Sequence, residues 1–170
     1  MKIFGKTLSE YIHFQWIMLA LILIVGILRL GLSLAGVPNH SVKWLSVTIL
    51  GLLGIFYYAI RVHTRNFGSY RHLLPLIVIQ NVVLQGIIIA GIVWGITTGQ
   101  DNIYTAPEYT VNPSTGQSGV EGKTWGHVGG HAVFGLLLGS ILAWGIASLV
   151  LLVVRKVAPR KGASGAVTTA

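Results

Sequence analysis

Four long apolar runs are the feature that most constrains this chain of 170 residues. They cover residues 14–35, 42–60, 73–97 and 128–154, and each has close to, or more than, the roughly 20 residues that a bilayer-spanning helix needs. Only 9% of all residues are charged, whereas a soluble domain carries about a quarter. We therefore predict an all-α integral membrane protein built as a bundle of four transmembrane helices.

The four spans leave no room for a second globular domain. We predict one membrane domain over residues 1–156 and a basic, disordered cytoplasmic tail over residues 157–170. A long loop, residues 98–126, separates the third span from the fourth and is rich in Thr, Ser, Gly and Asn. Loops of this length either cover a functional site or are disordered, and the sequence leaves both alternatives open.

The positive residues gather on one side of the predicted bundle. Only Lys43 and Lys123 fall in the loops of the other side, against nine that flank the opposite helix ends. This asymmetry predicts that both termini are cytoplasmic, as in a multi-pass protein of the inner (plasma) membrane of a prokaryote. The expected partners are the lipid bilayer, with anionic lipid at Arg61, Arg65 and Arg71, and not nucleic acid. The nine residues are Lys2, Lys6, Arg61, Arg65, Arg71, Arg155, Lys156, Arg160 and Lys161.

Two histidines four residues apart, His127 and His131, stand where the fourth span begins. This spacing puts both imidazoles on one face of a helix. A third histidine, His40, lies at a similar depth at the start of the second span. Imidazoles at the edge of lipid are costly unless they bind something, so these three residues form the candidate site, on the outer side of the membrane.

The candidate site suits two kinds of metal. Imidazoles on opposite helices are what a six-coordinate haem needs, so His40 facing His131 or His127 predicts a haem b. The same three histidines can ligate copper or zinc, with Asp101 or Glu108 completing the set. Interfacial histidines that bond only water and backbone carbonyls are the structural alternative.

Polar side chains inside the first and third spans extend the candidate site. Arg29 lies near the outer end of the first span, where its guanidinium suits a haem propionate, a phospholipid phosphate or a quinone oxygen, or else reaches the headgroups. Gln80, Asn81 and Gln85 lie in the third span. Amides in lipid usually bond neighbouring helices, and the functional alternative is a polar pocket for a quinone headgroup.

Small residues recur along the last two spans. A stripe with a spacing of four runs down the fourth span, and Gly91 and Gly95 make a notch in the third. Helices approach closely in lipid through such surfaces, so we predict helix–helix packing at both. The stripe consists of His131, Gly135, Gly139, Ala143 and Ala147.

The third and fourth spans resemble those of small four-helix membrane haem proteins, namely cytochrome b561-like proteins and the four-helix halves of haem A synthase. The likeness lies in Gln85-Gly86, a polar loop, and His131 followed by Gly135; the run Arg29 to Leu34 is similar to the arginine-bearing turn of haem A synthase. The resemblance implies outer-side haem ligation by His40 and His131. The chain departs from the pattern in placing His40 in a turn and in lacking an acidic residue beside the arginine-bearing helix, so no synthase activity is implied.

Three functions remain open. The first is a non-catalytic membrane subunit or assembly factor that contacts other membrane subunits or copies of itself. The second is a haem b-binding or quinone-contacting electron-transfer protein, and the third a metal or small-solute transporter. The chain has no cysteine, which excludes thiolate chemistry. It also has no phosphate-binding loop or serine-nucleophile motif, so nothing calls for an enzyme other than a membrane redox component.

Overall fold

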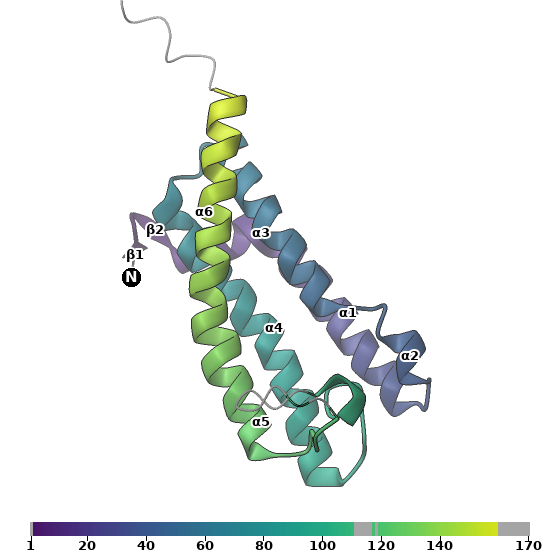
Figure 1. Cartoon of the computed structure of the whole chain (residues 1–170). Helices are drawn as coiled ribbons and strands as arrows, with labels where there is room; N and C mark the ends of the chain where they lie inside the picture. The colour runs from purple at the N-terminus through teal and green to yellow at the C-terminus, as the bar shows by residue number, and fades with distance from the viewer. Residues whose placement is uncertain (1, 111–116, 118, 160–170) are drawn as a thin grey trace, which may run out of the picture.

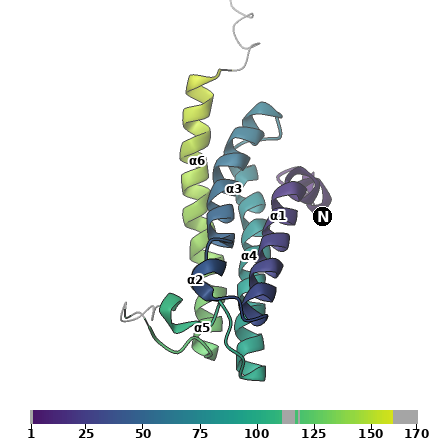
Figure 2. The ribbon, with the colours of Figure 1, turned by 90° about the vertical axis from the view of Figure 1, so that its right-hand side faces the viewer.

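The computed structural model describes residues 2–110, 117 and 119–159. Four long helical segments pack against one another, and they alternate in direction (Figures 1 and 2). Each of them is long and apolar enough to cross a membrane. The prediction of a bundle with four apolar helices of membrane-spanning length is therefore confirmed. By the length and composition of these helices, the protein is a multi-pass membrane protein.

Polar caps set the first residues of several helices, so the helix bounds differ from those of the apolar runs. Thr7 and Glu10 form a reciprocal capping box at the first helix. The Ser46 hydroxyl accepts from Ile49 N at 3.3 Å at the start of another. The elements are α1 (Leu8–Leu34), α2 (Asn39–Val42), α3 (Val47–Thr64), α4 (Tyr70–Thr98), the 3₁₀ turn η1 (Pro107–Tyr109), α5 (Trp125–Gly130), η2 (His131–Leu138) and α6 (Gly139–Val157).

A small antiparallel hairpin, β1 (Lys2–Ile3) and β2 (Lys6–Thr7), precedes α1 in the otherwise helical structure. Its turn residues Phe4 and Gly5 have φ angles of 51° and 87°, the backbone of a tight hairpin turn. The Tyr11 hydroxyl donates to Ile3 O at 3.0 Å and ties the hairpin to α1. Two-residue strands are too short for an alternating pattern to reveal them.

The third span, α4, is the centre of the bundle and contacts α1, α3 and α6. Two of its amides bond neighbouring helices. Gln80 Nε2 donates to Gly51 O of α3 at 3.0 Å, and Asn81 Nδ2 donates to Ser140 Oγ of α6 at 3.0 Å. The prediction that these amides join helices is confirmed.

The two ends of the bundle differ in charge. One end carries β1–β2, the α3–α4 connection and the last residues of α6, and we call it the terminal end. The other end carries α2, the described part of the loop between α4 and α5, and α5, and we call it the loop end (Figure 1). Of the described basic residues that flank the spans, only Lys43 and Lys123 lie at the loop end.

The fourth span changes its helical type along its length. α5 is an α-helix, η2 is a π-helix of eight residues, and α6 is again α-helical. A π-helix bonds residue i to i+5 and turns side chains away from the faces that α-helical spacing predicts. Such segments are frequent at functional sites. The first residue of η2 is His131, one of the candidate site residues.

Candidate ligand-binding cavity

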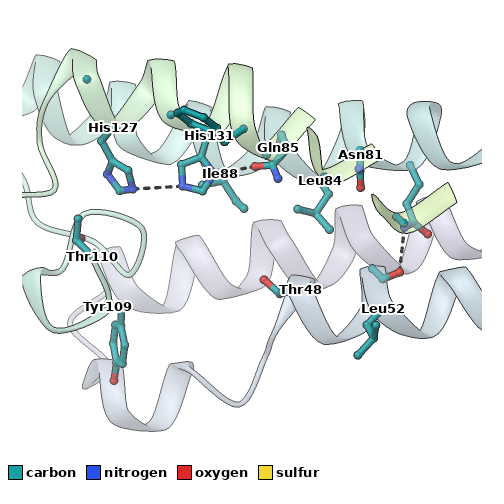
Figure 3. Close-up of a pocket in the computed structure, with 18 of the residues that line it drawn as sticks. Thr48, Leu52, Asn81, Leu84, Gln85, Ile88, Tyr109, Thr110, His127 and His131 are labelled. Carbon is teal, nitrogen blue, oxygen red and sulfur yellow. Dashed lines mark hydrogen bonds between the residues drawn. The ribbon is translucent and has the colours of Figure 1, made fainter. Parts of the chain in front are cut away.

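A cavity of about 960 Å³ lies between α3, α4 and the fourth span, at the loop-end half of the bundle. Binding pockets for small molecules occupy about 300–1,000 Å³. Apolar side chains of α3, α4 and η2 line it, together with Gln80, Asn81, Gln85, His127 and His131 (Figure 3). The cavity is thus apolar with a few polar groups, as is usual for ligand sites.

The two predicted histidines are the centre of a hydrogen-bonded row in this cavity (Figure 3). His131 Nδ1 lies 2.8 Å from Gln85 Oε1 of α4. His131 Nε2 lies 3.2 Å from His127 Nε2, and His127 Nδ1 lies 2.8 Å from Gly122 O of the loop. The prediction that both imidazoles share one helical face is confirmed, and the structure adds a partner for each ring.

Local sequence explains how the row is assembled. Thr124 caps α5, its hydroxyl accepting from His127 N at 3.1 Å. Gly135 leaves room for the Gln85 amide at the other end of the row. A Cβ at Gly135 would lie only 2.5 Å from Gln85 Nε2. The small-residue stripe of the fourth span therefore packs against α4, as predicted, and its residues Gly135 and Gly139 also line the cavity.

The notch of α4 receives the loop between α4 and α5 and not another helix, so the helix packing predicted at this notch is wrong. The Tyr104 ring lies against Gly91, where a Cβ would come within 2.5 Å of the ring, and Thr105 lies against Gly95 in the same way. Asn102 Nδ2 donates to Gly91 O at 2.8 Å. These loop residues are buried, so this part of the loop is an ordered element of the bundle.

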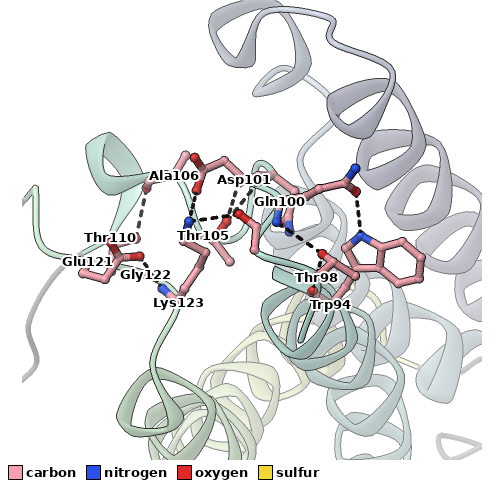
Figure 4. Close-up of polar contacts among 12 residues, drawn as sticks. Trp94, Thr98, Gln100, Asp101, Thr105, Ala106, Thr110, Glu121, Gly122 and Lys123 are labelled. Atoms are coloured by element: carbon pink, nitrogen blue, oxygen red, sulfur yellow. Dashed lines mark hydrogen bonds and ion pairs between the residues drawn. The ribbon is translucent and has the colours of Figure 1, made fainter. Parts of the chain in front are cut away.

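A set of polar contacts holds the two sides of this loop together (Figure 4). Lys123 Nζ lies 3.0 Å from Asp101 Oδ1 and donates to Gly99 O at 3.2 Å. The hydrogen bond to Asp101 raises the pKa of Lys123. Asp101 is therefore engaged by Lys123, and Glu108 accepts from Asn39 Nδ2 at 3.3 Å. Both acids that were predicted to complete a metal site thus have other partners.

Arg29 does not line the cavity. Its guanidinium carbon lies 5.2 Å from the centroid of the Tyr104 ring, a distance at which a cation and an aromatic face attract each other. The Tyr104 hydroxyl donates to Gly26 O of the same helix at 3.4 Å. Arg29 therefore contacts the inserted loop in this structure, an interaction that sequence reasoning did not anticipate.

The residues present do not fit a bis-histidine haem. His40 lies in the short helix α2, is exposed, and is not among the residues that line the cavity. His127 and His131 come from one helix and their Nε2 atoms face each other, so they cannot ligate from opposite sides of one porphyrin. In the part of the chain that the structure describes, no three His, Cys, Asp or Glu residues cluster as a metal site.

Sequence reasoning missed Gly122 and Tyr104. Neither belongs to a periodic pattern, and only the aromatic character of Tyr104 within a polar loop hints at burial.

Comparison of the chain with protein-family models, curated proteins and solved structures finds no match. The likeness to four-helix membrane haem proteins therefore rests on the sequence motifs alone.

Proposed function

We propose that this protein binds a membrane-soluble ligand of the quinone class, with an apolar body and carbonyl or hydroxyl oxygens, in the cavity between α3, α4 and the fourth span. The observation that carries the proposal is the meeting of three amides and two imidazoles from two helices on one apolar-walled cavity. Neither helix alone supplies this combination.

The chemistry of the lining suits such a ligand. Leu52, Ile55, Leu84 and Ile88 supply apolar wall, which a ring or isoprenoid chain covers favourably. The Asn81 and Gln85 amides and the two imidazoles line the same cavity, and such groups can bond the carbonyl or hydroxyl oxygens of a ligand.

Filling the cavity from α6 tests this proposal. A Cβ at Gly139 would make only ordinary contacts, at 3.5 Å from Phe134 O and 3.8 Å from Asn81 Nδ2, so Gly139→Leu places its larger side chain in the cavity. The expected result is a loss of about tenfold or more in affinity, since one lost contact of 1.4 kcal/mol is already a factor of ten. The measurement is quenching of tryptophan fluorescence by a short-chain ubiquinone analogue, with metal-free protein in lipid nanodiscs.

The matched control is Gly145→Leu on the same helix. Gly145 is exposed, and a Cβ there meets no atom within 4 Å, so this variant should bind the analogue as the wild type does. Equal affinities in the wild type and both variants, or no saturable binding to the wild type, would contradict the proposal.

We also propose that the terminal end faces the cytoplasm of a prokaryotic cell and that the loop end lies outside, because the basic residues gather at the terminal end. Single cysteines test this in a chain that has none. A membrane-impermeant maleimide should label Ser41→Cys at the loop end in intact cells, and Thr64→Cys at the terminal end only after permeabilisation. The reverse pattern would invert the assignment.

A non-catalytic subunit or assembly factor is the second candidate. It is favoured by the exposed apolar face of α6, where Leu142 and Leu149 are 69% and 66% exposed. Lipid covers such a face equally well, so the discriminating measurement is the mass of the particle extracted from native membranes in a mild detergent. A particle containing other protein chains would support the subunit role; a single chain would oppose it.

A further inference from the structure

We infer that His127 and His131 chelate one divalent transition-metal ion, with zinc(II) or cobalt(II) as suitable probes, between their two Nε2 atoms. This inference goes beyond the proposed quinone site and is independent of it, because it depends only on the histidine row. It also differs from the three-ligand site expected from sequence, since His40 takes no part.

The first argument is the position of the protons. Gly122 O can only accept a hydrogen bond, so the proton of a neutral His127 ring lies on Nδ1, 2.8 Å away. Gln85 Oε1 likewise accepts from His131 Nδ1 at 2.8 Å. With both protons on Nδ1, both Nε2 atoms carry lone pairs, and these atoms face each other at 3.2 Å. Two facing lone pairs repel unless a cation lies beside them.

The second argument is the spacing. Two imidazole nitrogens bound at about 2.0–2.1 Å to one tetrahedral zinc ion lie about 3.3 Å apart. The observed separation of the two Nε2 atoms is 3.2 Å. The ring centroids are farther apart, at 4.9 Å, so the nitrogen-bearing edges of the two rings face each other, as chelation requires.

The third argument is the surrounding shell. Histidines that bind metals almost always donate their other ring N–H to a carbonyl or carboxylate, which sets the tautomer and orients the ring. Gly122 O and Gln85 Oε1 supply both acceptors. Imidazole suits zinc, copper, nickel and iron. Two protein ligands leave the remaining positions to water or to a molecule in the cavity, which both rings line.

A metal-free arrangement of the same atoms defines the competing outcome. If the Gln85 amide were turned over, its Nε2 would donate to His131 Nδ1, and the His131 proton would move to Nε2. His131 would then donate to His127, and two neutral rings would complete the row without a cation. Alternatively, a third proton shared by the two Nε2 atoms would replace the metal.

Titration of the full chain in nanodiscs, stripped of metal and without added quinone, tests the inference. We expect one zinc ion per chain by competition with a chromophoric chelator, and a visible cobalt(II) spectrum of tetrahedral type. His127→Asn and His131→Asn place an amide N–H near each Nδ1 position, so they retain the bond to Gly122 or Gln85 while removing Nε2. Each should lower affinity by more than the about 10–100-fold that loss of an outer-shell partner costs.

Two further variants complete the design. Gln85→Leu removes only the acceptor of His131 and should weaken zinc binding by about 10–100-fold. His40→Ala removes an exposed histidine of the same end and should leave binding unchanged. The inference is overturned if the wild type binds neither metal, or if both asparagine variants bind as the wild type does. Because no quinone is present, such a result leaves the proposed function standing.

Discussion

The Tyr104→Ala variant is expected to lose about 3–5 kcal/mol of its free energy of unfolding, the usual cost of removing a buried aromatic side chain. Tyr104 is only 7% exposed. Its ring fills the notch at Gly91, its hydroxyl donates to Gly26 O, and Arg29 lies over its face. Removing the ring leaves a void between α1 and α4 and exposes the polar loop backbone to lipid, where unsatisfied groups are costly.

Thermal unfolding in nanodiscs measures this effect, and two variants control it. Tyr104→Phe retains the ring and loses one 3.4 Å hydrogen bond, so about 1 kcal/mol is expected. Tyr109→Ala makes the same alanine substitution at a tyrosine of the same loop that is 42% exposed, and should have a small effect. A loss for Tyr104→Ala as small as that for Tyr109→Ala would show that the buried Tyr104 ring contributes little to the fold.

The Gly54→Ala variant should be destabilised by about 1–3 kcal/mol, the range for overpacking of a filled core. Helix propensity alone predicts the opposite sign, because alanine is favoured over glycine by about 0.5–1 kcal/mol. The packing around Gly54 predicts a net loss of stability. A Cβ at Gly54 would overlap Gln80 Oε1, and the Gln80 amide is held by its bond to Gly51 O.

Denaturant or thermal unfolding of four variants isolates this contact: Gly54→Ala, Gly31→Ala, Gln80→Ala and the double variant of Gln80 and Gly54. Gly31→Ala places the same methyl where no atom lies within 4 Å, so it should be neutral or stabilising. In a Gln80→Ala background the methyl at Gly54 has room, and Gly54→Ala should cost much less there. An equal cost with and without the Gln80 amide would mean that the overlap is not the cause.

The candidate site could be located from the sequence but not completed. The spacing of His127 and His131 correctly places both rings on one helical face, and the amides of α4 were recognised as interhelical donors. The hydrogen-bond partner of Gln80 lies 29 positions away in the chain and that of Asn81 lies 59 positions away. His131 and Gln85 are 46 positions apart. Helical periodicity says nothing about which helices become neighbours, so these pairs could not be derived from it.

The expectation that His40 faces the fourth span was wrong because position along a span does not determine the direction of a side chain. Its apparent depth at the start of the second span suggested a position opposite the fourth. In the structure, Pro38 precedes the short helix α2, and the break between α2 and α3 leaves His40 exposed. The depth of a residue follows from its place along a span, whereas the direction of its side chain depends on local breaks in the helix.

The amino-acid sequence by itself determined that this chain forms four membrane-spanning helices, because each apolar run is long enough to cross a bilayer and can satisfy its backbone only within a helix. It also determined the charge difference between the two ends. Only the tertiary structure decided that a loop fills the α4 notch, that η2 begins at His131, and that Gln85 and Gly122 hold the histidine rings. These features depend on contacts between segments distant in the chain, which are settled by packing and not by local periodicity.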